Sequence, residues 1–250
     1  MTPVQIAEKA SPERLERHLS SLATIGGMPD GGVNRQVLTV DDRAGRRYLV
    51  DLARELDLEI STDAIGNQFF RFPGVDSRAV PAVTTGSHLD TQPTGGRLDG
   101  VLGIVAGFEA CAAMRDAGFS PHHSIEIVNW TNEEGCRFSP GCMGSMVHVG
   151  TKALQDCLTT VDADGITFAE ALHDTLVDHP TGAARETGRP MRSYVELHIE
   201  QGPVLTLAGR PVGVVSSIQG CRWFEIGIFG ETRHAGTTPL SARRDALREA

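Results

Sequence analysis

Apolar positions along the first third of the chain predict two helices. Residues 11–26 (SPERLERHLSSLATIG) place Ser11 as a helix cap, Pro12 at the first helical position and Gly26 as a stop signal. Residues 41–58 (DDRAGRRYLVDLARELDL) repeat apolar side chains at helical spacing. Both segments therefore predict helices with one apolar face.

The next segments alternate between strand and helix patterns. Residues 58–74 (LEISTDAIGNQFFRFPG) predict two strands around a turn at residues 65–67. Residues 79–87 (AVPAVTTGS) form a short apolar, β-branched run that predicts a buried strand. Residues 100–118 predict a helix that Asp99 could cap. The order of these elements is typical of an α/β domain.

The alternation continues to about residue 200. Residues 123–134 (HSIEIVNWTNEE) predict a strand that runs into acidic residues, and residues 193–202 (SYVELHIEQG) predict a third buried strand. Between them, helical patterns cover part of residues 143–156 and residues 167–176. We predict an α/β fold with a mostly parallel sheet, because helices connect successive strands.

The pattern changes near residue 213. Residues 213–229 alternate between two faces, which predicts antiparallel strands of a second unit, so we expect domains at 1–212 and 213–250. Residues 237–250 (TTPLSARRDALREA) read as a helix start, with Thr237 or Thr238 as its cap and Pro239 in the first turn. This helix reaches the end of the sequence without a stop signal, so we expect a longer protein.

Composition excludes several classes of protein. The 40% hydrophobic content supports a packed core, while a formal net charge of −9 argues against broad binding of nucleic acid. The five cysteines are odd in number and form no CxxC pair, which argues against a disulfide framework and favours a reducing, cytoplasmic location. No signal-peptide core or membrane-length apolar run is present in the sequence.

Polar residues with metal-binding chemistry follow three of the predicted strands. His88 and Asp90 follow the first, Glu133 and Glu134 end the second, and His198 lies at the end of the third. The carboxyl ends of parallel strands meet at one edge of a sheet, where ligands bind in such folds. We therefore expect these side chains to converge.

Each position also has a purely structural interpretation. His88 and Asp90 could lie in an exposed loop, although residues two apart in an extended segment face the same side, so Asp90 could orient the His88 ring. Asp99 could cap a helix, bind a metal, or do both with its two oxygens. Glu133 and Glu134 could be an exposed strand end, or one could bind a metal while the other acts as a general base.

Taken together, the residues form a set of nitrogen and oxygen ligands without a thiolate. Such a set suits Zn²⁺, Mn²⁺, Co²⁺ or Ni²⁺. A carboxylate shared by two metals about 3.5–4 Å apart would make a hydrolytic centre. The sequence has no P-loop, no GxGxxG after a strand and no GxSxG, which argues against the corresponding nucleotide-binding and serine-hydrolase sites.

Four motifs, in order, carry a family resemblance: GSHLDTQPTGGRLDG, NWTNEEGCRFSP, ELHIEQGPVL and RHAGTTPLSARRDAL. They resemble the amidase/hydantoinase/carbamoylase family of di-zinc exopeptidase-like amidohydrolases. Its members include N-carbamoyl-L-amino-acid hydrolases, which the motifs resemble most, allantoate amidohydrolases and β-ureidopropionases. The resemblance runs from about Gly32 to Ala250, and Cys136 and residues 142–144 depart from the expected pattern.

The resemblance implies a role for each candidate residue. His88 and His198 would bind one metal, Asp99 would bridge two, and Glu134 would bind the second. Glu133 would be the general base that activates water and passes its proton to the leaving nitrogen.

The resemblance also implies roles for residues other than the metal ligands and the general base. Asp90 would orient His88, and Gln201 is a candidate for substrate binding. His234 would reach the neighbouring subunit's reaction centre from a lid domain that also forms a homodimer, and it would stabilise the oxyanion. A final metal-binding histidine and a substrate-binding arginine are expected after Ala250.

The resemblance implies hydrolysis of a carbamoyl C–N bond, with an N-carbamoyl-L-amino acid as the expected substrate. Allantoate or β-ureidopropionate hydrolysis on the same site is an alternative. An aminopeptidase is disfavoured, because peptidase relatives more often place a carboxylate where this chain has His198. A chain that is an inactive fragment of such an enzyme is the remaining alternative.

Overall fold

A computed structural model describes most of the chain in two compact units, Met1–Gln201 and Gly202–Ala250. The described residues are 2–76, 80–178, 182–220, 222, 224 and 226–249. The domain boundary near residue 213 stays a prediction.

The first unit is built on a six-stranded sheet with the order β5-β1-β2-β4-β3-β6. Strand β2 runs opposite to the other five, since it pairs antiparallel with β1 and β4, whereas the β1–β5, β3–β4 and β3–β6 pairs are parallel. The predicted α/β class with a mostly parallel sheet is therefore confirmed. The strands are β1 (Glu59–Thr62), β2 (Gln68–Phe72), β3 (Val83–His88), β4 (Ile125–Trp130), β5 (Ala183–Ala184) and β6 (Ser193–Val195).

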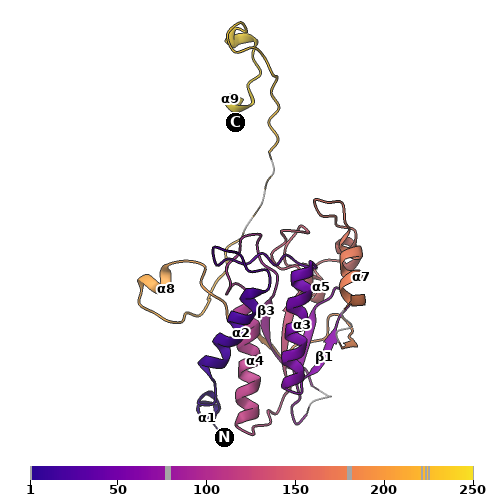
Figure 1. Ribbon diagram of the computed structural model, residues 1–250, viewed down its shortest axis with the longest axis vertical. Coiled ribbons are helices and arrows are strands. Elements are labelled where there is room, and N and C mark those ends of the chain that lie inside the picture. Colours follow the sequence, from indigo (N-terminus) through magenta and orange to yellow (C-terminus); the bar gives the residue numbers. More distant parts are fainter. Residues whose placement is uncertain are drawn as a thin grey trace. The chain divides into compact units, whose positions relative to one another are not determined.

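The helices of the first unit are α1 (Pro3–Ala7), α2 (Pro12–Thr24), α3 (Val40–Glu55), α4 (Val101–Asp116), α5 (Met143–His148), α6 (Leu154–Leu158) and α7 (Phe168–Asp178). Helices α2, α3 and α4 pack on one face of this sheet, and His148 of α5 contacts Phe69 and Trp130 on the other. Figure 1 shows α2, α3 and α4 side by side in front of the sheet. None of the described helices is long and apolar enough to cross a membrane.

Side-chain alternation in the central strands divides the core between the two faces. Phe70 of β2 and Ile127 of β4 pack with α2, α3 and α4 in the main apolar cluster. Their neighbours Phe69 and Val128 point to the other face, where they pack with Trp130. This is the period-two pattern of a sheet buried on both faces.

The predicted helix starts are formed by local capping. The Ser11 hydroxyl accepts the backbone N–H of Arg14 at the start of α2, as expected from the sequence. Arg14 then forms ion pairs with Glu109 and Asp116 of α4, at 2.7 and 2.8 Å. These contacts fix α2 against α4, the helix that begins beside the candidate site.

Asp99 does not cap α4, so that prediction is wrong. The cap position belongs to Gly100, whose φ of +66° is left-handed and which makes no side-chain cap bond. The backbone turns at Gly100, and the Asp99 side chain is directed instead toward His198, with its Oδ1 3.2 Å from the ring Nε2.

Two predicted strands are shorter than their sequence patterns. Strand β4 ends at Trp130, and the chain turns through Asn132 at φ +57°, so Glu133 and Glu134 lie in a turn and not on opposite sides of a strand. Strand β6 is three residues long and exposed at the sheet edge, because it pairs with β3 alone among the described strands. The prediction of a buried third strand is therefore wrong.

The second unit departs further from the predicted pattern. The described residues between 213 and 230 form no strand, and the apolar side chains of Phe224, Ile226 and Phe229 are exposed without a partner ladder to bury them. Three positions of this predicted segment, Cys221, Trp223 and Glu225, lie outside the described residues.

The helix predicted from residue 237 is also divided. A short 3₁₀ turn, η1 (Leu240–Ala242), precedes α9 (Ala246–Glu249), and α8 (Val204–Leu207) lies earlier in the unit. Arg243 donates to the Thr238 carbonyl, and Asp245 accepts the Leu247 N–H, so a second cap forms inside the predicted helix.

Candidate metal centre

His88 ends β3 with its ring buried and its tautomer fixed. Its Nδ1 lies 2.8 Å from the carbonyl oxygen of Asp90, and its side chain is 3% exposed. Because a carbonyl only accepts hydrogen bonds, Nδ1 carries the proton in the neutral ring. The Nε2 lone pair is therefore available to a metal.

His198 presents the same tautomer from the neighbouring segment. Its Nδ1 lies 2.8 Å from the carbonyl oxygen of Ile199, which leaves Nε2 unprotonated in the neutral ring. The two imidazole centroids are 6.2 Å apart, with an angle of 30° between the rings. Both histidines thus offer Nε2 to one shared space.

Asp99 completes the group between the two rings. Its Oδ1 lies 3.2 Å from His198 Nε2 and 4.0 Å from His88 Nε2, and the three donor atoms all lie within 4.8 Å of one another. Among the described residues this oxygen is buried without a hydrogen-bond partner. A buried, unpartnered carboxylate oxygen is costly, and a divalent cation would satisfy it. The donor set therefore fits a metal of the zinc or manganese type.

Glu133 borders this group from the solvent side. Its Oε2 lies 3.4 Å from His88 Nε2, and its side chain is 35% exposed. The Cys142 thiol donates to the other oxygen at 3.7 Å. A carboxylate in this place is near enough to the ligands to act on a molecule held beside them, yet open enough to exchange a proton.

Glu134 is not part of this three-residue donor group, and its side chain contacts Gln92 instead. Gln92 Nε2 donates to its Oε2 at 2.5 Å. The Asp90 carboxylate accepts the backbone N–H groups of Glu133 and Glu134 at 3.3 and 3.1 Å. Asp90 thus orients His88 through its main chain, while its side chain holds the glutamate turn.

The surrounding charges favour a cation. Burial alone would lower the pKa of His88, but the nearby carboxylates of Asp90 and Glu133 outweigh it and raise this pKa above its usual value. Burial raises the pKa of Asp90 to about 6. The same negative field that stabilises an imidazolium would stabilise a metal ion.

Three contributors to this geometry were missed in the sequence. A Cβ on Gly100 would lie 2.5 Å from His88 Nε2, so only glycine fits beneath the ring. Gln92 holds Glu134, as described above. Arg35 is 1% exposed and donates to the Leu89 carbonyl at 3.0 Å, directly after His88. Only the glycine that follows Asp99 gave a local signal, because arginine and glutamine are ordinarily read as surface residues.

Arg35 braces the site by bridging the helical layer to the loop after β3. Besides Leu89, its guanidinium donates to the carbonyls of Leu22 and Ile25 at 2.8 Å each. Burial lowers the pKa of Arg35. Three carbonyl partners compensate for the desolvation of the charge.

Two further candidates have distinct surroundings. Gln201 donates to Asp99 Oδ2 at 2.7 Å, so it contacts a candidate metal ligand. His234 belongs to the second unit, where its Nδ1 accepts the backbone N–H groups of Gly236 and Thr237 at 3.1 and 3.2 Å. Its Nε2 therefore carries the proton and is a donor.

Comparison with known protein families identifies the family of this chain. The model of peptidase family M20/M25/M40 matches residues 84–249, which include every candidate metal ligand described above. The chain belongs to this family.

Relatives within it confirm the resemblance seen in the motifs. The chain is 41% identical over 240 residues to an N-carbamoyl-L-amino-acid amidohydrolase of Rhizobium meliloti, covering 95% of this chain and 56% of that protein. It is 34% identical to a ureidoglycolate hydrolase of Arabidopsis thaliana, covering 93% of this chain and 50% of that protein. A hydantoinase/carbamoylase family amidase of Burkholderia vietnamiensis has a TM-score of 0.87 at 41% identity, covering 96% of this chain and 57% of that structure. The chain thus spans about half the length of the relatives it matches.

Proposed function

We propose that this protein is a metal-dependent amidohydrolase that cleaves the carbamoyl C–N bond of an N-carbamoyl-L-amino acid. The observation that carries the proposal is the convergence of His88, Asp99 and His198, with Glu133 3.4 Å from His88 Nε2. The match to carbamoyl amidohydrolases supports the choice of bond. Two divalent ions would provide Lewis-acid chemistry and a water of lowered pKa.

Residues of this chain would supply several of the ligands of these ions. His88 and His198 would bind the first ion through Nε2, and Asp99 would bridge the pair. Glu134 would bind the second ion after exchanging its contact with Gln92, which is a single hydrogen bond. We place the remaining ligands of that ion outside residues 1–250, in keeping with a chain that spans 56% of the relative from Rhizobium meliloti.

Proton transfer is assigned to Glu133. It would accept the proton of the attacking water and deliver it to the leaving nitrogen, which converts the carbamoyl group into carbamate and frees the amine. Its partial exposure leaves the carboxylate accessible to a water molecule and to a substrate held beside the ligands. Asp90 would keep Glu133 in place by accepting its backbone N–H.

His234 would stabilise the developing oxyanion. Its Nδ1 already accepts two backbone N–H groups, so Nε2–H is the donor that the role requires. We propose that this contact crosses between subunits of a homodimer, as the family resemblance implies. Gln201 would act on the site through Asp99, which it contacts, and a direct bond to substrate would require it to leave that carboxylate.

A second ureido substrate is favoured by one observation. The Arabidopsis relative, 34% identical to this chain, is named a ureidoglycolate hydrolase, and allantoate and β-ureidopropionate present the same carbamoyl group. A panel of these compounds and N-carbamoyl-L-amino acids, assayed with the full-length protein and Zn²⁺ or Mn²⁺, would rank the substrates by kcat/KM.

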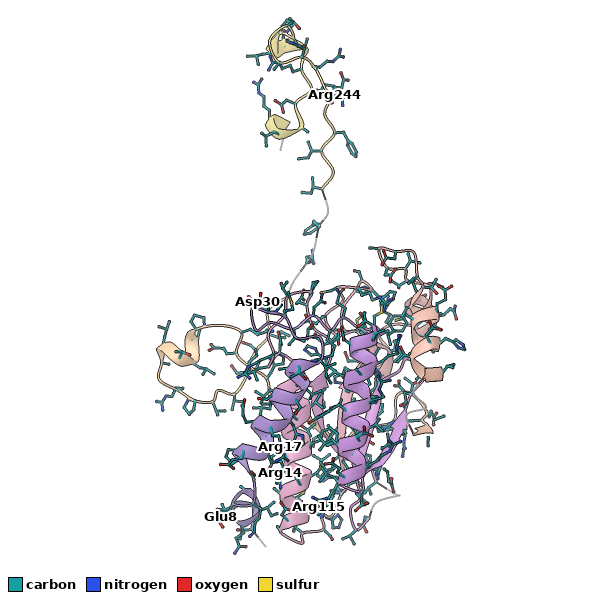
Figure 2. The ribbon with its side chains drawn as sticks, in the orientation of Figure 1. Glu8, Arg14, Arg17, Asp30, Arg115 and Arg244 are labelled. Atoms are coloured by element: carbon teal, nitrogen blue, oxygen red, sulfur yellow. The ribbon has the colours of Figure 1, made fainter. Side chains whose placement is uncertain are left out.

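The Glu133→Gln variant tests the proton-transfer role. Loss of a general base typically lowers turnover by about 10²–10⁴-fold, and Gln keeps the size and polarity of the side chain. We expect kcat to fall by that amount while bound metal, measured by elemental analysis, is unchanged. Glu8→Gln, on the surface beyond α1, is the matched control (Figure 2). Full activity in Glu133→Gln would refute the assignment.

A further inference from the structure

The carboxylate of Glu196 links the two segments that carry the histidines. Its Oε1 accepts the Ser87 hydroxyl at 2.5 Å, and its Oε2 accepts the Tyr194 hydroxyl at 2.7 Å. Ser87 directly precedes His88, and Glu196 precedes His198 by two residues. One side chain therefore connects the end of β3 to the end of β6 just before both candidate ligands.

This link lies where the backbone pairing has ended. The β3–β6 ladder comprises Val83–Ser193, Thr84–Tyr194 and Thr85–Val195. If the same register continued, position 88 would stand opposite position 198. The Ser87–Glu196 bond lies between the last backbone pair and the histidines, one residue out of that register. It therefore joins the two segments by side-chain contact after the backbone ladder has ended.

The far end of the link is anchored in the sheet. Trp130, the last residue of β4, donates its indole N–H to the Tyr194 hydroxyl at 3.0 Å. Burial and the Glu196 carboxylate raise the pKa of Tyr194, so its hydroxyl stays protonated and remains a donor to Glu196. The network thus spans β4, β6 and β3.

The side chain of His198 is less enclosed than that of His88. Its side chain is 30% exposed, against 3% for His88. Downstream, Gln201 fixes the segment to Asp99 at 2.7 Å. His198 is thus held between one side-chain bond before it and another after it.

We infer that Glu196 is a positioning residue that sets His198 for metal binding, acting through the Ser87 and Tyr194 hydroxyls. The inference rests on the metal centre of the proposed function. Replacing Glu196 would let the His198 segment move away from β3 without removing a metal ligand. Outer partners of metal ligands typically contribute 10–100-fold in affinity.

The test measures Zn²⁺ affinity of the full chain by competition with a chromophoric chelator. We expect Glu196→Ala to weaken Zn²⁺ binding by about 10–100-fold. Glu196→Gln should restore affinity to within a few-fold, because its amide oxygen can accept from Ser87 and its amide N–H can donate to Tyr194. In excess chelator, Glu196→Ala and Glu196→Gln should unfold at the same temperature. This measurement separates positioning of His198 from a general loss of stability.

A double-mutant cycle identifies the residue through which Glu196 acts. In a His198→Ala background, Glu196→Ala should change Zn²⁺ affinity by less than about two-fold, since the ligand it positions is gone. Equal affinity of wild type and Glu196→Ala, or an undiminished effect in the His198→Ala background, would overturn the inference alone. Failure of the wild-type protein to bind Zn²⁺ or Mn²⁺ would overturn the metal centre and the inference together.

Discussion

The two arms of the candidate metal centre differ in how firmly the fold holds them. The His88 arm (residues 83–103) begins in a strand with six paired residues against β4 and continues into α4. The His198 arm (residues 193–201) begins in a three-residue strand at the exposed sheet edge. The core therefore fixes one ligand, whereas the other depends on a short edge ladder and a few side-chain bonds.

Replacing each histidine in turn by alanine should reveal this asymmetry most clearly. We expect His88→Ala and His198→Ala each to lower Zn²⁺ affinity by more than about 100-fold, beyond the range of outer-shell substitutions. Only His88→Ala should also lower the free energy of unfolding in chelator, by about 1–2 kcal/mol, because it leaves a buried cavity. Chelator competition and denaturant unfolding measure the two effects. Equal unfolding of the two variants would contradict the comparison.

Gly100 offers a steric test of the His88 arm. Gly100→Ala places a Cβ 2.5 Å from His88 Nε2 at a residue with φ +66°, so both overpacking and backbone strain arise. We expect a loss of about 3 kcal/mol in the free energy of unfolding, together with weaker Zn²⁺ binding. Gly96→Ala, in the same loop with no atom within 4 Å of the added Cβ, is the matched control. If both variants unfold alike, the close packing of Gly100 is not essential.

Arg35 tests the brace behind the same arm. Arg35→Met keeps the aliphatic bulk but leaves the carbonyls of Leu22, Ile25 and Leu89 without this donor, which should cost about 2 kcal/mol in unfolding free energy. Arg97→Met removes an exposed ion pair with Glu16 at 3.6 Å and should change unfolding by less than about 0.5 kcal/mol. Denaturant titration measures the unfolding free energy of both variants. An unchanged unfolding free energy in Arg35→Met would contradict the role of Arg35 as a brace.

The smallest effect is expected on the His198 arm at Gln201. Gln201→Ala removes the bond to Asp99 Oδ2, and we expect Zn²⁺ affinity to fall about 10-fold, at the low end for outer partners. Unfolding in chelator should not change, since Gln201 is exposed. Calorimetric Zn²⁺ titration provides the measurement. A large loss of metal-free stability would show that this arm is as firmly held as the other.

Much of the fold was encoded locally and could be predicted. Ser11 and Pro12 define the start of α2, and the turn at residues 65–67 joins two paired strands, because caps and turns depend on a few neighbouring residues. Of the candidate ligands predicted at strand ends, His88 does end β3, whereas Glu134 and His198 lie beyond the ends of β4 and β6. The length and burial of β6 could not be predicted, because an apolar run does not indicate how many neighbouring strands will pair with it.

The amino-acid sequence was sufficient to predict the order of the main strands and helices of the first unit, the candidate histidines and carboxylates, and the motifs of the family. The folded structure was needed to show that Gly100 rather than Asp99 takes the N-cap of α4, and that the Asp90 carbonyl oxygen contacts the His88 ring. It also showed that Glu196 joins the two histidine segments. Helical and strand periodicity depends on neighbouring residues. In contrast, the turn at Gly100 depends on its packing against His88, and the Ser87–Glu196 bond joins residues 109 apart in the sequence.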